Sequence, residues 1–156
     1  MKIFEDYLMY ILIEKHRMLY NRWLRPVSSG ELKKGAELVL RLMAERQVEL
    51  WLLDASCCNT PGRDDQEWVV GRIGKLLTGK RARLRKLALV KSNDVFYGVV
   101  AEWMREKLHK LHGGSLRMQC FDSMTDAHSW LQEGAAASTA TNALTTDGEL
   151  GHEREV

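Results

Sequence analysis

The sequence has few cysteines, no long apolar run and a small net charge, and each scarcity excludes a class of protein. Three cysteines among 156 residues, Cys57, Cys58 and Cys120, are an odd number for a disulfide framework. No stretch approaches the roughly 20 apolar residues of a membrane span. Residues 7–13 are apolar but follow two acidic residues rather than the basic start of a signal peptide. We therefore expect a cytoplasmic protein.

The net charge of +2 is unevenly distributed along the chain. Residues 135–156 hold four acidic residues and one arginine, a net charge of −3, which leaves +5 for the rest. The most basic segment, residues 80–86, could meet phosphate groups of nucleic acid, lipid or nucleotide. It has no aromatic side chain on which a base could stack. We therefore interpret it as a solvated connection and expect no nucleic-acid partner.

Apolar patterning predicts the element order β-β-α-β-α-β-α-β-α. Short apolar runs predict strands at residues 7–14, 18–24, 48–54, 85–90 and 116–121. Helical spacing of apolar residues predicts amphipathic helices at residues 28–46, 64–79, 93–112 and 123–131. A strand pair followed by repeated αβ units predicts an α/β domain: a mixed, mostly parallel sheet of about five strands with four helices packed against it.

Capping residues mark the expected helix starts. Ser28 with Glu31 three residues later is a capping-box pattern. Asp64 is the expected cap of the second helix, and Asn93 or Ser92 that of the third. These signals place a short connection before each helix.

The composition changes after Gly134. Residues 135–156 contain no aromatic residue and show no apolar periodicity. We expect one domain over residues 1–134 and a flexible low-complexity tail over residues 135–156, with a partner-binding peptide as the alternative interpretation of the tail.

Several landmarks along residues 1–133 resemble a known family. They are Trp23 closing the second strand, the WLLD run at 51–54, the acidic helix start at 64–68, the LALV strand at 87–90, and Phe121-Asp122 before a helix that ends in Trp130-Leu131. This pattern resembles the STAS-like fold, in particular the branch described as SpoIIAA-like or STAS/SEC14-like.

The resemblance implies a non-enzymatic regulatory or protein-interaction module. Anti-sigma-factor antagonists of this fold bind a partner through the region after the third strand and are switched by phosphorylation of a serine at the next helix start. Ser56 occupies the matching place, although Ala55 and Cys57 stand beside it instead of the family's hydroxyl residue and glycine, and a loop separates it from the helix. The implied phosphoacceptor or partner-binding site comprises Asp54, Ser56, Cys57, Asp64 and Asp65. Its expected partner is another protein or a second copy of the chain.

The sequence contains no evident catalytic constellation. His109 and His112 could share a helix face, but no acidic or cysteine ligand is placed to complete a metal site. The enzyme alternative is a nucleophilic Cys57 or Cys58, which the acidic residues of the following helix start oppose. We therefore expect no catalytic residues, no metal and no cofactor.

Tryptophan supplies a second function hypothesis from a different class. Trp23 and Trp68 could line a hydrophobic groove between a strand and a helix. Such a groove would suit a small apolar ligand, as the SEC14-like label suggests, or a dimer contact. The alternative to the interaction module is therefore a binder or sensor of a small apolar molecule.

Overall fold

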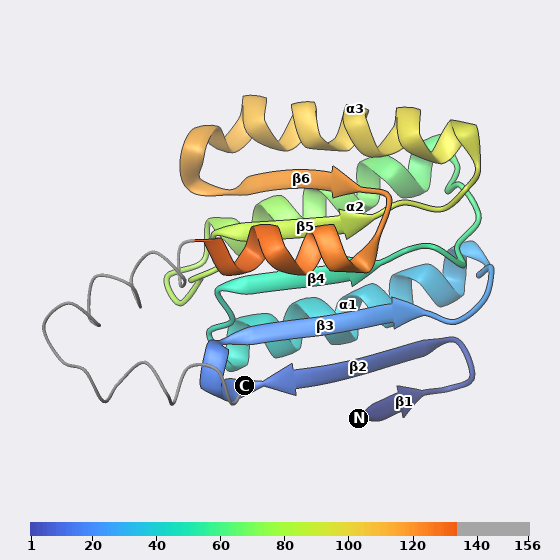
Figure 1. Cartoon of the computed structure of the whole chain (residues 1–156). Helices are drawn as coiled ribbons and strands as arrows, with labels where there is room; N and C mark the ends of the chain where they lie inside the picture. The colour runs from blue at the N-terminus through green and yellow to red at the C-terminus, as the bar shows by residue number, and fades with distance from the viewer. Residues whose placement is uncertain (134–156) are drawn as a thin grey trace, which may run out of the picture.

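A computed structural model describes residues 1–133, in which six strands form one sheet (Figure 1). The strands are β1 (Lys2–Phe4), β2 (Leu8–Ile13), β3 (Met18–Trp23), β4 (Leu50–Asp54), β5 (Lys86–Val90) and β6 (Arg117–Phe121), and they lie side by side in that order. The first three pair antiparallel, and β3 to β6 pair parallel. The predicted mixed, mostly parallel sheet is confirmed. The predicted tail lies outside the described residues.

The sheet has one strand more than predicted. β1 pairs with β2 through the register Lys2↔Tyr10, Ile3↔Met9 and Phe4↔Leu8. Three residues are too few to show the alternation by which a strand is recognised in a sequence. Glu5, with a φ of 55°, lies in the turn that follows β1.

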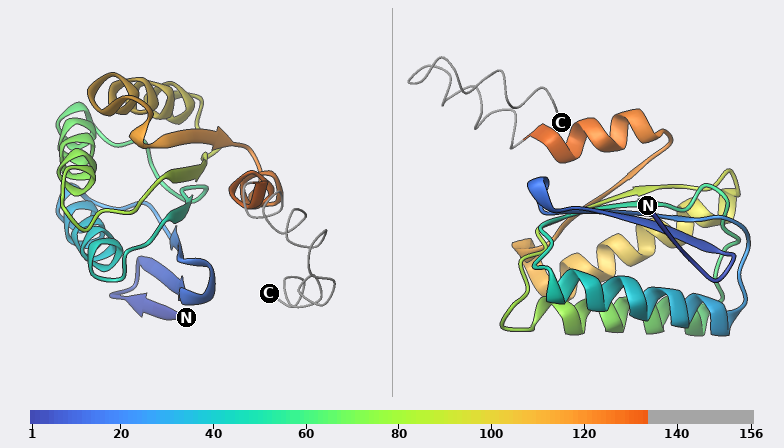
Figure 2. Two further views of the ribbon diagram at one scale, coloured as in Figure 1. Left: turned by 90° about the vertical axis from the view of Figure 1, so that its left-hand side faces the viewer. Right: turned by 90° about the horizontal axis from the view of Figure 1, so that it is seen from below.

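Helices cover both faces of the sheet (Figure 2). α1 (Ser29–Glu45), α2 (Arg63–Leu77) and α3 (Val95–His112) lie on one face, and the last helix, residues 124–133, lies on the other. Each of the first three connects two neighbouring parallel strands, and crossovers of one hand that advance in one direction place their helices on the same face. No helix in residues 1–133 is both long and apolar enough to cross a membrane.

The predicted capping box at the start of α1 is confirmed, whereas α2 has a different cap. The hydroxyl of Ser28 accepts from the Glu31 backbone N–H at 3.2 Å, and the Glu31 carboxylate accepts from the Ser28 backbone N–H at 3.0 Å. α2 begins after Gly62, whose position provides no side-chain cap. The prediction of Asp64 as a cap is wrong because the helix begins earlier, so that Asp64 lies in its first turn.

The cap of α3 is also shifted along the chain. Asp94 is the N-cap, and its carboxylate accepts from the backbone N–H of Phe96 at 3.0 Å. The prediction of Asn93 or Ser92 is wrong, because the hydroxyl of Ser92 accepts from the Asp94 backbone N–H at 3.2 Å instead. Adjacent polar residues all satisfy the sequence rule for a cap, so the rule could not choose among them.

Alternation along the central strands builds two apolar layers. Leu19, Trp51 and Leu87 face α1, α2 and α3, since successive side chains of a strand point to opposite faces. The intervening residues pack with the last helix: Met18, Leu50, Leu52, Ala88 and Val90 contact the cluster of Ala127, Trp130 and Leu131. The central strands are therefore buried on both sides, as their continuous apolar runs predict.

Lys86 departs from the predicted solvated basic segment. It is 4% exposed, its Nζ donates to the backbone oxygen of Trp130 at 3.1 Å, and burial lowers its pKa. The other four basic residues of the segment are exposed. The solvated interpretation is wrong for Lys86 because β5 begins at this residue and is covered by the last helix.

Candidate ligand cavity

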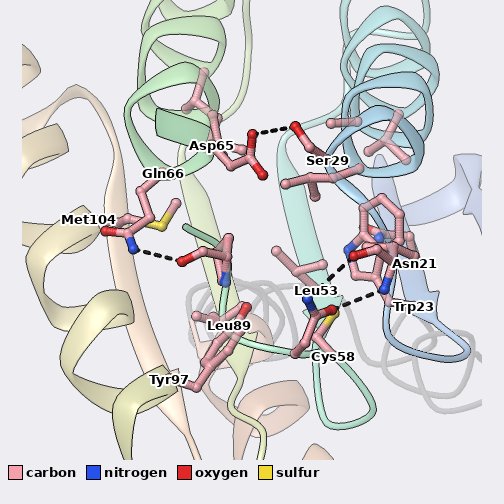
Figure 3. A pocket seen from close by; sticks show the side chains of 18 of the residues that line it. Asn21, Trp23, Ser29, Leu53, Cys58, Asp65, Gln66, Leu89, Tyr97 and Met104 are labelled. Atoms are coloured by element: carbon pink, nitrogen blue, oxygen red, sulfur yellow. Dashed lines mark hydrogen bonds between the residues drawn. The ribbon is translucent and has the colours of Figure 1, made fainter. Parts of the chain in front are cut away.

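A cavity of about 350 Å³ lies between the sheet and the three helices of one face (Figure 3). Strands β3 to β6 supply its floor, and the inner faces of α1, α2 and α3 supply its walls. Most lining side chains are apolar: Trp23, Val27, Leu32, Ala36, Val39, Trp51, Leu53, Val69, Ile73, Leu87, Leu89, Met104 and Met118. The strand residues among them belong to the side of the sheet that faces these helices.

Trp23, one of the two predicted groove residues, is a rigid wall of this cavity. It is 5% exposed, and its ring stacks on that of Tyr7 with centres 6.2 Å apart and planes 2° apart. Its other neighbour is Gly35 of α1, where a Cβ would lie only 2.7 Å from the Trp23 ring. Glycine therefore allows the helix to approach the indole closely, and the ring is held between two elements.

Trp68, the other predicted groove residue, is not among the residues that line the cavity. The Nζ of Lys33 lies 5.9 Å from its ring centre, and the guanidinium carbon of Arg72 lies 5.7 Å away. Cations at such distances are attracted by the ring face. The structure therefore places the two tryptophans in different surroundings, with Trp68 paired to cations of α1 and α2.

Asn21 is a buried polar residue in the cavity wall. It is 1% exposed, and its Oδ1 accepts from the indole N–H of Trp51 at 2.6 Å. Because an indole N–H can only donate, this bond fixes which end of the amide is the oxygen. The amide nitrogen makes no hydrogen bond within residues 1–133 and is not among the fully buried unpartnered atoms, so it is open to the cavity. The cavity wall therefore carries a free amide donor.

The two other polar groups deep in the cavity are held uncharged. Burial raises the pKa of the Cys58 thiol to about 12, with smaller contributions from Cys57 and Asp54. Burial also raises the pKa of the Tyr97 hydroxyl. Both groups are neutral near pH 7, and of all the lining residues only Asp65 carries a charge.

Polar residues form the mouth of the cavity. The Ser29 hydroxyl donates to Asp65 at 2.7 Å, joining the first turns of α1 and α2 (Figure 3). The Asn59 side chain accepts from the backbone N–H of Val27 at 2.9 Å and donates to its carbonyl oxygen at 3.3 Å. The Asn59 bonds tie the loop after β4 to the connection after β3, and the Ser29 bond ties α1 to α2, so two sets of hydrogen bonds hold the rim.

The predicted partner-binding residues fall into two groups, and the first lies at the end of β4. The Asp54 carboxylate is buried, accepts from the backbone N–H of Ser56 at 2.9 Å and lies 3.7 Å from the Nε of Arg22. Arg22 also donates to the Cys57 sulfur at 3.4 Å. Arg22 and Asp54 face away from the cavity, because the alternate residues Asn21 and Leu53 line it.

The second group lies at the start of α2. Asp64 is exposed, whereas Asp65 lies at the cavity mouth with the Nζ of Lys33 4.0 Å away. Ser56 is exposed and lies seven positions before the first residue of α2. The structure therefore brings Asp54, Ser56 and Cys57 together and separates them along the chain from the helix start.

Metal-binding groups do not gather in the described part of the chain. Within residues 1–133, no three histidine, cysteine, aspartate or glutamate side chains are close enough together to hold an ion. The cysteines of these residues are all free thiols.

Comparisons with known proteins give one informative result. No family model matches the sequence, and no curated protein matches it. A matching solved structure is that of an uncharacterised protein from the DUF3478 family of Shewanella loihica PV-4, described as having a SpoIIAA-like fold. It shares 15% identity with this chain, covers 84% of this chain and 98% of its own, and superposes with a TM-score of 0.51.

The chain has a SpoIIAA-like fold. The resemblance inferred from the sequence is thus confirmed at the level of the fold. An identity of 15% extends no further, so the cavity and the loop of this SpoIIAA-like chain must be interpreted from its own residues.

Several cavity residues of this SpoIIAA-like chain went unrecognised in the sequence. Asn21 had a usable signal, because it alternates with Leu19 and Trp23 on the face of a strand that must be buried. A polar residue at such a position needs a partner. Asn59 and Tyr97 had no signal, since their places in the cavity depend on contacts between elements far apart in the chain.

Proposed function

We propose that this chain is a non-enzymatic module that binds a small apolar molecule in the cavity behind Trp23. The observation that carries the proposal is an apolar space of about 350 Å³ with a buried amide in its wall. Small-molecule sites span about 300–1,000 Å³ and combine apolar walls with a few polar groups. The proposal therefore favours the ligand-binding alternative over the interaction module.

Water is a poor occupant of this space. The cavity has room for roughly a dozen water molecules at about 30 Å³ each. Such molecules could bond to one another, but the thirteen apolar side chains of the lining would offer them few hydrogen-bond partners on the protein. Replacing weakly bonded water with an apolar group is favourable, so the cavity suits an apolar ligand.

A fluorescent probe tests this proposal. N-phenyl-1-naphthylamine is neutral and brightens in apolar surroundings, so we expect a saturable rise in its emission with the wild-type chain. Ala36→Leu, which fills part of the cavity, should abolish the rise. Ala127→Leu, on the opposite face of the sheet, is the matched control and should leave it unchanged once folding is checked by circular dichroism. A probe that fails to bind, or that binds Ala36→Leu equally well, would contradict the proposal.

A second candidate function is the protein-interaction module that the resemblance implies. Its support is an apolar patch at the start of α3, formed by Val95, Phe96 and Val99, of which Phe96 is 72% exposed. The patch adjoins the loop after β4, because the Thr60 hydroxyl donates to Asp94 at 2.7 Å. An uncharged apolar patch is complementary to a copy of itself, so we propose a homodimer as its occupant.

Measuring the molecular mass of the protein in solution tests the proposed homodimer. We expect light scattering to give the mass of a dimer for the wild type and of a monomer for Phe96→Asp. Leu111→Asp is the control, because Leu111 is also exposed but lies at the opposite end of α3. A wild-type chain that stays monomeric at high concentration would exclude the dimer. Phosphate at Ser56, found by peptide mapping of the natively expressed protein, would support the switch that the resemblance implies.

A further inference from the structure

The side-chain amide nitrogen of Asn21 indicates which chemical group a ligand in the cavity would present to it. The amide is 1% exposed, its oxygen is taken by Trp51, and its nitrogen has no acceptor among the described residues. The nitrogen is not one of the fully buried atoms without a partner, so it is open to the cavity, where only water or a bound molecule can accept from it. An acceptor on the bound molecule would supply the missing partner.

The charges around the cavity exclude an ionised head group. No lysine, arginine or histidine is among the lining residues, so a carboxylate inside would lose its water without gaining a counter-charge. Free N–H groups at the start of α2 could attract an anion, but Asp64 and Asp65 already occupy its first turn. A cation would find no carboxylate in the interior, because Asp65 accepts from Ser29 at the mouth and lies near Lys33.

We propose that the ligand is a neutral apolar molecule with one hydrogen-bond acceptor, a ketone or ester carbonyl, that accepts from the Asn21 amide. The inference rests on the proposed ligand-binding function and names the ligand class. The cavity volume of about 350 Å³ lies at the lower end of the roughly 300–1,000 Å³ range of small-molecule sites, so the ligand is a small one. Asn21 is then a specificity-determining residue, and the apolar walls supply most of the affinity.

Displacement of N-phenyl-1-naphthylamine by nine-carbon compounds tests the inference. The compounds are 2-nonanone, 1-nonene and nonanoate, which share chain length and differ in the acceptor and the charge. We expect the preference for 2-nonanone over 1-nonene to fall roughly 5- to 100-fold in Asn21→Leu, since the variant buries the carbonyl without a donor. The ratio of the two affinities cancels any general loss of binding in the variant.

A second measurement needs no variant, because Asn21→Leu also deprives the Trp51 indole of its acceptor and could impair folding. In the ¹⁵N spectrum of the wild type, the side-chain amide signals of Asn21 should shift with 2-nonanone and stay in place with 1-nonene. Equal shifts, or an unchanged affinity ratio, would overturn the inference while leaving ligand binding intact. Tighter binding of nonanoate would overturn the neutral class. Absence of probe binding would instead defeat the proposed function itself.

Discussion

Ala36 offers the most direct test of the cavity, because its methyl group borders the space from α1. Ala36→Leu adds three carbon atoms that can extend into an existing void instead of displacing neighbours. The same substitution at Ala127 would place the three added carbon atoms in a layer that is already filled. Ala127 is 0% exposed in the last helix and packs among Leu50, Leu52 and Trp130.

The expected changes in the free energy of unfolding have opposite signs. Three buried carbons contribute about 2.4 kcal/mol at about 0.8 kcal/mol each. Ordering a leucine side chain costs about 0.5–1 kcal/mol, so Ala36→Leu should stabilise the chain by about 1.5 kcal/mol. Ala127→Leu overpacks a filled layer and should destabilise it by about 1–3 kcal/mol.

Urea denaturation followed by circular dichroism measures both values under the same conditions. A midpoint that rises for Ala36→Leu and falls for Ala127→Leu, with similar slopes, is the expected result. Destabilisation of both variants by more than about 1 kcal/mol would mean that α1 packs on the sheet without a void. That outcome would refute the reasoning behind the ligand proposal as well.

Two further predictions probe the surroundings of the cavity. Gly35→Ala should destabilise the chain by about 1–3 kcal/mol, because the new Cβ would lie 2.7 Å from the Trp23 ring. Gly71→Ala, where nothing lies within 4 Å of the new Cβ, should stabilise the chain by about 0.5–1 kcal/mol. Thermal melts that give both variants the same sign would contradict this packing. Cys58, with its pKa raised to about 12, should react with iodoacetamide at pH 8 roughly a hundredfold more slowly than an ordinary thiol; rapid labelling of Cys58 in peptide maps would revive the enzyme alternative.

Local patterns predicted most of the architecture. Runs such as Leu50–Asp54 and Lys86–Val90 are apolar at every position or nearly so, which is typical of strands covered on both faces. The capping box at Ser28 is a signal contained within four residues. Their order along the chain predicted the mixed, mostly parallel sheet, and the resemblance carried by landmarks such as Trp23 and the WLLD run implied the SpoIIAA-like fold.

Features that depend on distant contacts could not be predicted in this way. Trp23 and Trp68 are both large aromatic residues near predicted element ends. Only the folded structure shows that Trp23 lines the cavity, whereas the ring of Trp68 lies next to the cations of Lys33 and Arg72. Lys86 belongs by sequence to a basic segment, yet the last helix, which follows almost 40 residues later, buries it. In each case the decisive neighbour is far away in the chain.

Asn21 shows how the two kinds of information combine. Alternation with Leu19 and Trp23 puts its side chain on a buried face, and this much can be inferred from the sequence. Only the structure shows that Trp51 takes the amide oxygen, which leaves the nitrogen as a donor at a void. A filled core would have no use for that donor, and a water-filled cleft would satisfy it without selectivity. In an apolar cavity the Asn21 amide is one of the few polar groups, with the Cys58 thiol and the Tyr97 hydroxyl, by which a neutral ligand can be recognised, so Asn21 is where the ligand proposal is most open to refutation.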